Sequence, residues 1–137
     1  MEYNSKQTAN LFNYNETGVI ELLNRDFSVN GIGEIIVAHP MFSHKNGLIM
    51  FYAPWCPHCK KHINTFTNLA MMNGTQFPIA AVNCENKAND SIKKYAKIAG
   101  FPTLKYVHKD GTLSTYTGDR NLKALQKFIC NKSGICN

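Results

Sequence analysis

The hydrophobic positions of the chain fall into short blocks, and the spacing within each block predicts strands and helices. Residues 47–53 (Gly-Leu-Ile-Met-Phe-Tyr-Ala) form a continuous apolar run, which is typical of a central strand covered on both faces. Residues 77–82 (Phe-Pro-Ile-Ala-Ala-Val) predict a second buried strand, and residues 19–23 predict a shorter one. The apolar residues of segment 32–37 are β-branched, but its length suits either a strand or a helix. The chain therefore contains the apolar strands that a buried sheet needs.

Three other segments carry apolar residues at the spacing of a helix. The first begins at a pair of cysteines and runs to about residue 72, with Pro57 in its first turn, where the missing N–H costs nothing. The second is capped at residues 89–90 and ended by Gly100. Asn121 caps the third. The apolar face of this third helix consists of Leu122, Leu125, Phe128 and Ile129.

Two alternating runs, residues 103–108 and 113–116, flank Asp110-Gly111 and predict a β-hairpin, because Asp-Gly is a favoured turn. The order of elements is β, an uncertain crossover, β, α, β, α, β, β, α. This order predicts an α/β fold with a central mixed β-sheet flanked by helices on both faces. Residues 1–17 show no hydrophobic period and predict a flexible N-terminal extension, so the domain is placed at residues 18–137.

Charge and hydropathy exclude several classes of protein. Fifteen Lys and Arg against nine Asp and Glu give a net charge of +6, but the lysines are scattered rather than gathered as in a nucleic-acid patch. The beginning of the sequence lacks the apolar segment of a signal peptide, and no apolar run approaches the roughly 18 residues of a membrane span. We therefore expect a monomer that binds neither nucleic acid nor membranes, whose charge favours solubility and acidic partners.

The five cysteines are an odd number and cannot all pair within one molecule. Cys56 and Cys59 form a Cys-x-x-Cys motif at the start of the first predicted helix, where partial positive charge and free N–H groups stabilise a thiolate. One turn later, Cys59 is close enough to attack a mixed disulfide on Cys56. The alternatives are a structural disulfide and a zinc half-site. His58 and His62 lie near the motif, but no second ligand pair follows at zinc-finger spacing, so we expect no metal.

Three separated motifs give the chain a resemblance to a known family. They are Phe51–Lys61 (Phe-Tyr-Ala-Pro-Trp-Cys-Pro-His-Cys-Lys-Lys), Phe101–Leu104 (Phe-Pro-Thr-Leu) and Tyr116–Arg120 (Tyr-Thr-Gly-Asp-Arg). In this order they resemble a thioredoxin-fold domain of the protein disulfide isomerase type over roughly residues 18–130. The resemblance implies that Pro102 is a cis-proline facing the cysteines, with Phe101 and Thr103 beside a groove for an extended peptide. It also implies that Trp55 shields the site.

The dipeptide between the two cysteines bears on the redox potential. Pro57-His58 is the pair found in strongly oxidising bacterial periplasmic oxidases, and a protonated or hydrogen-donating His58 favours the Cys56 thiolate. The motif therefore predicts a potential in the oxidising half of the family's range. Cys56 is the expected nucleophile and Cys59 the resolving thiol, and no cofactor is needed.

Some positions depart from the family pattern. Six residues before the nucleophile, relatives hold a buried acid where this chain has Met50, and the lysine that pairs with this acid in many relatives falls on Ala81. Either charge alone in the core would be costly, so the joint absence is coherent. It leaves Cys59 without the usual general base and predicts slow release of mixed disulfides. Arg120 matches the family arginine that lowers the pKa of the second cysteine. Asn64 replaces a helix-kinking proline and predicts a straighter helix.

The predicted function is that of a thiol–disulfide oxidoreductase acting on protein dithiol or disulfide substrates. The alternative is a thioredoxin-fold binding or structural component, for example of a virion, with weak redox activity. Cys84 is expected to be a small core residue. Cys130 and Cys136 fit either a disulfide, structural or shuttling electrons to Cys56, or two free thiols.

The location is predicted from composition. An excess of Asn and Lys is typical of an A/T-rich genome. A large DNA virus that assembles disulfide-bonded particles in the cytosol would reconcile an oxidising motif with the absence of a signal peptide. We therefore expect a cytoplasmic protein, with association with a virion as a further possibility.

Overall fold

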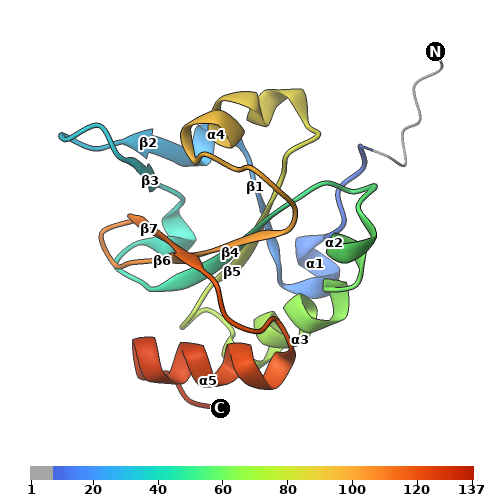
Figure 1. The fold of residues 1–137 in the computed structure, drawn as a ribbon. Coiled ribbons are helices and arrows are strands. Elements are labelled where there is room, and N and C mark those ends of the chain that lie inside the picture. Colours follow the sequence, from blue (N-terminus) through green and yellow to red (C-terminus); the bar gives the residue numbers. More distant parts are fainter. Residues whose placement is uncertain (1–7) are drawn as a thin grey trace.

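A five-stranded mixed sheet forms the centre of the computed structural model, which describes residues 8–137 (Figure 1). In spatial order its strands are β1 (Ile20–Leu22), β5 (Ile79–Asn83), β4 (Gly47–Tyr52), β6 (Thr103–Val107) and β7 (Leu113–Tyr116). Strand β4 pairs parallel with β5 and antiparallel with β6, which makes the sheet mixed as predicted. Every residue of β4 is buried, in agreement with its continuous apolar sequence.

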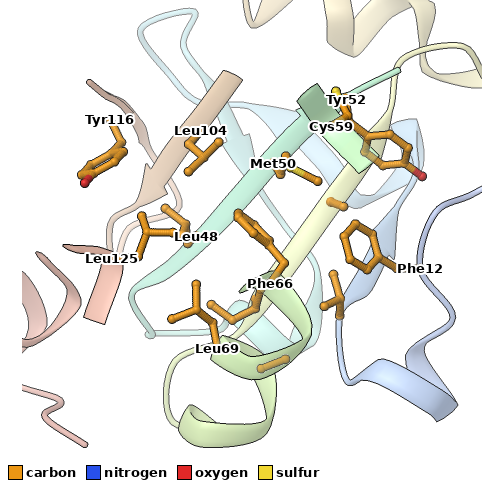
Figure 2. Packing of buried hydrophobic residues seen from close by; sticks show 14 of the residues in the cluster. Phe12, Leu48, Met50, Tyr52, Cys59, Phe66, Leu69, Leu104, Tyr116 and Leu125 are labelled. Carbon is orange, nitrogen blue, oxygen red and sulfur yellow. The ribbon is translucent and has the colours of Figure 1, made fainter. Parts of the chain in front are cut away.

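Helices cover both faces of the sheet, which confirms the predicted fold class. Helices α1 (Tyr14–Thr17), α2 (Pro57–Lys60), α3 (Ile63–Asn73) and α5 (Leu122–Ser133) lie on one side. Figure 2 shows Phe66 and Leu69 of α3 packed against the strand residues Leu48 and Met50 on this side. The opposite face is covered by α4 (Asp90–Tyr95) and a separate hairpin of β2 (Phe27–Val29) and β3 (Ile35–Val37). Three short 3₁₀ helices, Asn24–Asp26, Pro40–Phe42 and Lys87–Asn89, complete the connections.

Segment 32–37, whose length suited either a strand or a helix, contains strand β3. Its partner, strand β2, was not predicted from the sequence. Strand β2 pairs antiparallel with β3 around a turn in which the Asn30 side chain accepts hydrogen bonds from the backbone N–H groups of Ile32 and Glu34. Both strands have only three residues, and Val29 is 60% exposed. Such short, half-exposed strands carry too little hydrophobic period to be recognised.

The prediction of a straight helix after the cysteines was wrong, because the helix breaks at Lys61-His62. The N–H of His62 bonds to the Cys59 carbonyl three residues back, and the backbone of His62 leaves helical geometry (φ −99°, ψ 3°). A 3₁₀ turn of this kind changes the direction of a helix without any proline. Replacement of the kinking proline by Asn64 therefore does not straighten the segment.

The second predicted helix ends earlier than Gly100. Helix α4 stops at Tyr95, and Lys97 adopts a left-handed conformation (φ 57°). The N–H of Ile98 then bonds to the Lys93 carbonyl, and the N–H of Lys97 bonds to the Lys94 carbonyl. These two bonds form a Schellman motif, which satisfies the last carbonyls of a helix.

The structure differs from the predicted domain boundary at residue 18. Residues 8–17 lie against the domain, and Phe12 is only 4% exposed, with its ring against Tyr52 and Phe66. A single buried aromatic residue gives no sequence period, which is why the pattern did not reveal this packing. The rest of the expected extension, residues 1–7, lies outside the described residues. Within residues 8–137, every helix is too short or too polar to cross a membrane.

Candidate active site

The two cysteines follow the carboxyl end of β4, the central strand of the sheet. It ends at Tyr52, and a tight turn follows in which the N–H of Cys56 bonds to the Ala53 carbonyl at 3.0 Å. Cys56 is the N-cap of α2, and its carbonyl accepts hydrogen bonds from the N–H groups of Cys59 and Lys60, both at 3.1 Å. Pro57 occupies the first turn, as predicted.

The Cys56 thiol faces the loop that contains Pro102. Its sulfur lies 3.9 Å from the Phe101 carbonyl oxygen, and the Phe101-Pro102 peptide bond is cis, as the family resemblance implies. Cys56 is 7% exposed and is not disulfide-bonded. Its side chain makes no capping hydrogen bond to the helix, so the sulfur is not held by α2 itself. The thiol therefore lies beside the Pro102 loop, at the N-terminal end of α2.

Cys59 lies behind Cys56 in the hydrophobic core. It is fully buried and not disulfide-bonded. Burial is the largest cause that raises the pKa of the Cys59 thiol to about 12, and the neighbouring Cys56 adds to it. The pair therefore divides into a sulfur that is only slightly exposed, beside the Pro102 loop, and a sulfur held in its protonated form in the core.

Aromatic side chains border the exposed side of Cys56. Trp55 is 47% exposed, and its ring meets Phe101 edge to face at a centroid distance of 6.3 Å. The indole N–H of Trp55 donates to the Glu85 carboxylate at 3.0 Å. Thr103 is half-buried, and its hydroxyl donates to the Gly100 carbonyl at 2.7 Å. Trp55 and Phe101, with Pro102 and Thr103 next in the chain, thus lie at the cysteine turn, where the sequence motifs predicted a substrate groove.

Two further predicted residues occupy the other side of the turn. His58 is exposed, and Arg120 is half-buried before α5. Arg120 lies close enough to His62 to help lower the pKa of that imidazole, whose burial is the larger cause. The causes of the raised Cys59 pKa do not include Arg120. In this conformation the positive charge of Arg120 therefore acts on His62 rather than on Cys59.

The positions of the missing ion pair lie side by side in the core. Met50 of β4 is in register with Ala81 of β5, and both are fully buried. Glu21 of β1 is in register with Ala81 on its other side. Glu21, Ala81 and Met50 therefore form one row across three neighbouring strands. The Glu21 carboxylate lies two strands away from Met50, the position at which relatives carry their buried acid.

Glu21 is the functional group that the sequence analysis missed. Its carboxylate accepts hydrogen bonds from the Tyr52 hydroxyl at 2.5 Å and from the Phe12 N–H at 3.2 Å. Burial raises the pKa of Glu21 to about 7, although both hydrogen bonds lower it. The Tyr52 oxygen in turn accepts the N–H of Leu11 at 2.9 Å. A charged residue inside the apolar run 19–23 was the available signal, but strand alternation alone would place it on a solvent face.

The remaining cysteines are not part of the Cys-x-x-Cys turn, although Cys84 is near enough to add to the raised pKa of Cys59. Cys84 is 3% exposed at the end of β5 and is not disulfide-bonded, and burial raises its pKa to about 12. Cys130 and Cys136 form a disulfide with a Cα–Cα distance of 4.5 Å. Within residues 8–137, there is no group of three or more His, Cys, Asp and Glu side chains that could hold a metal ion.

Comparisons with known proteins agree with this geometry. The Thioredoxin family model matches residues 25–131. A mitochondrial thioredoxin domain-containing protein of Schizosaccharomyces pombe is 41% identical over 87 residues, covering 60% of this chain and 24% of the relative. Mouse protein disulfide-isomerase A5 is 37% identical over 87 residues, covering 62% of this chain and 17% of the relative. Protein disulfide-isomerase 1 of Dictyostelium discoideum is 32% identical over 108 residues, covering 72% of this chain and 30% of the relative. The chain thus spans less than a third of the length of these relatives.

Solved structures show the same fold. The J-Trx1 fragment of ERdj5 superimposes with a TM-score of 0.67 at 21% identity, covering 86% of this chain and 53% of that structure. Human ERp44 superimposes with a TM-score of 0.57 at 26% identity, covering 66% of this chain and 28% of that structure. These similarities show that the chain has the fold of these thioredoxin-like structures.

Proposed function

Because the chain belongs to the thioredoxin family, we propose that it is a thiol–disulfide oxidoreductase acting through Cys56 and Cys59. The observation that carries the proposal is the arrangement of the two sulfurs. Cys56 caps the N-terminus of α2 beside the cis peptide of Pro102, and Cys59 is buried one turn behind it. A nucleophilic thiol with a second thiol one helical turn behind it is the arrangement that disulfide exchange requires.

The exchange proceeds in two displacements. The Cys56 thiolate attacks one sulfur of a substrate disulfide, forms a mixed disulfide and releases the first substrate thiolate. Cys59 then loses its proton and attacks the Cys56 sulfur, which forms the Cys56–Cys59 disulfide and releases the second substrate thiolate. The substrate gains two electrons and the protein loses two. In the reverse direction the oxidised pair takes two electrons from a substrate dithiol.

The second displacement is the step that the core makes slow. Attack by Cys59 requires its thiolate, and its pKa of about 12 keeps that form scarce at neutral pH. Met50 and Ala81 offer no carboxylate to take the proton. We propose that resolution of the mixed disulfide, rather than attack by Cys56, limits turnover in the reducing direction.

The direction of electron flow is a further proposal. His58 directly follows Pro57 and is exposed. A positively charged imidazole at this position favours the reduced form of the cysteine pair, because it stabilises the Cys56 thiolate. We propose a potential nearer the bacterial oxidase, about −120 mV, than thioredoxin, about −270 mV. Equilibration of the cysteine pair with glutathione buffers measures it, and a value near that of thioredoxin would refute this part of the proposal.

Insulin reduction and exchange with glutathione disulfide test the activity itself. We expect the Cys56→Ser variant to fall to background in both assays, and the Cys59→Ser variant to accumulate a mixed disulfide visible by mass spectrometry. Lys127→Ser serves as the control, because Lys127 is exposed on α5 away from the cysteine turn. Wild type that is no faster than Cys56→Ser would favour the alternative, a binding or structural component, which the apolar Met50 and Ala81 positions support.

The partners follow from this activity. We propose protein dithiols and disulfides as substrates and a monomeric enzyme. The proposed place of action, the cytoplasm or a virion assembled there, rests on sequence composition.

A further inference from the structure

The surface on the α2 side of Cys56 is positively charged. His58, Lys60 and Lys61 are exposed within five residues of the thiol. The half-buried imidazole of His62 has its pKa lowered first by burial and then by the positive charges of Arg120, Lys61 and His58. These groups are therefore close enough to act on one another across the break between α2 and α3.

A further cation lies on the opposite side of the thiol. The Lys93 ammonium on α4 lies 5.6 Å from the centroid of the Phe101 ring. The backbone carbonyl of Phe101 is the one that lies 3.9 Å from the Cys56 sulfur, and the Phe101 ring also contacts Trp55. Through Phe101, Lys93 of α4 is therefore linked to the Cys56 sulfur from a different element than the cations that follow the cysteines.

The nearby carboxylates do not neutralise these charges. Glu85 accepts the indole N–H of Trp55 at 3.0 Å, and exposed Asp119 precedes Arg120. Within residues 8–137, Lys60, Lys61, Lys93 and Arg120 form no ion pair with a carboxylate. The cations around the cysteine turn thus outnumber its acids and remain available to a ligand.

We propose that this site selects polypeptide substrates whose reacting cysteine is flanked by acidic side chains, with Lys61 and Lys93 determining the selectivity from the two sides of Cys56. The inference rests on the proposed oxidoreductase function and names its substrate class. Exposed charges attract one another weakly as single pairs, but several cations around one groove raise the local concentration of an anionic partner and its association rate. The chemistry of the exchange is unchanged, because the cations act on the approach of the substrate.

The test uses three symmetric peptide disulfides, Ac-Xaa-Xaa-Cys-Xaa-Xaa-NH₂ dimers in which Xaa is Glu, Gln or Lys. Trp55 is the single tryptophan and lies next to Cys56, so its fluorescence reports the reaction of the reduced protein. We expect the Glu peptide to react about tenfold faster than the Lys peptide at an ionic strength of about 10 mM, with the ratio approaching one at about 500 mM. The Gln peptide should fall between them.

Charge-reversed variants locate the effect. Lys93→Glu and Lys61→Glu should each lower the Glu-to-Lys rate ratio at least threefold. Lys127→Glu is the matched control, because this lysine is exposed on α5 and its reversal changes the net charge equally. A change in the reactivity of Cys56 alters the rates with the Glu and Lys peptides equally, so it does not change their ratio.

The outcomes separate the inference from the function on which it rests. A wild-type ratio at or below one, a ratio that salt does not change, or an equal loss in Lys127→Glu would overturn the selectivity. A Gln peptide that reacts no faster with wild type than with Cys56→Ser would instead refute the oxidoreductase function.

Discussion

The chain holds two pairs of cysteines at opposite kinds of helix end. Cys56 and Cys59 lie at the N-terminus of α2 as free thiols, whereas Cys130 lies near the C-terminus of α5 and is bonded to Cys136 in the tail. A helix N-terminus stabilises a thiolate, and a C-terminus, with its partial negative charge, destabilises one. Cysteine is thus placed for disulfide exchange at the N-terminus of α2 and for a stable disulfide near the C-terminus of α5.

The surroundings of the two pairs reinforce this difference. The tail disulfide holds Ile135 against the core, and the Asn137 amide donates to the Asn73 side chain at 2.7 Å. Asn73 ends α3, a helix of 11 residues that begins just beyond Cys59 and is therefore about 16 Å long. Sulfurs must come into contact to exchange, so the tail pair cannot pass electrons directly to Cys56 within one molecule. The structure thus favours a structural bridge over the shuttle.

Alkylation kinetics give the largest expected difference. After mild reduction at pH 7, iodoacetamide should label one thiol quickly, and that thiol should be Cys56. Cys59 should react at least about 100-fold more slowly, because a thiol of pKa about 12 has a very small thiolate fraction. Mass spectrometry of timed samples identifies the labelled residues.

The tail cysteines provide the contrast in the same experiment. We expect Cys130 and Cys136 to remain unlabelled until a strong reductant is added. Labelling of the tail pair as fast as Cys56 under mild reduction would remove the distinction between a reactive and a structural pair.

Removal of the tail disulfide should affect stability and spare activity. The bridge joins residues separated by 6 positions, and the chain-entropy model assigns a loop of this size about 2 kcal/mol of stability. We expect the Cys130→Ser/Cys136→Ser double variant to unfold with about that much less free energy in urea. Its exchange rate with glutathione disulfide should stay within twofold of wild type.

Wild type unfolded in strong reductant is the internal control, since it should lose the same stability. A double variant that kept its stability but lost exchange activity would mean that the tail pair takes part in the redox chemistry.

Sequence reasoning succeeded where several adjacent residues carried one signal. The continuous apolar run of β4 and the Cys-x-x-Cys motif that follows it predicted both the central strand and the position of Cys56. The state of Cys130 and Cys136 could not be predicted, because it depends on a single backbone angle. Gly134 adopts φ 79° and reverses the chain after α5, which brings Cys136 back to Cys130.

Long-range contacts of isolated residues also escaped prediction. Residues 8–12 cover the face of β1 on which Glu21 lies, and only that cover turns an apparently surface carboxylate into a buried one. Neither the residues around Glu21 nor those around Phe12 indicate that these two residues meet in the fold. Likewise, no residue type in the segment marks the break between α2 and α3 at His62.

Glu21 allows an effect to be predicted that appears only as a dependence on pH, and it separates the two regions in this way. The folded chain holds a proton on Glu21 up to a pKa of about 7, whereas the unfolded chain releases it near 4.5. Between these values the folded state binds more protons, so the free energy of unfolding falls as the pH rises, by about 3 kcal/mol in total. This stability is present in full below pH 4.5 and is lost through pH 7.

The Glu21→Gln variant isolates that contribution. Glutamine keeps an oxygen for the Tyr52 hydroxyl and the Phe12 N–H but cannot ionise, so its urea unfolding should lack this decrease between pH 5 and pH 8. His62, whose pKa is lowered, works in the opposite direction in both proteins, and the difference between wild type and variant removes its effect. The tail double variant should be less stable at every pH and keep the wild-type slope. Equal slopes in wild type and Glu21→Gln would show that Glu21 does not titrate in this window, and a changed slope in the tail variant would show that the two ends of the chain are coupled.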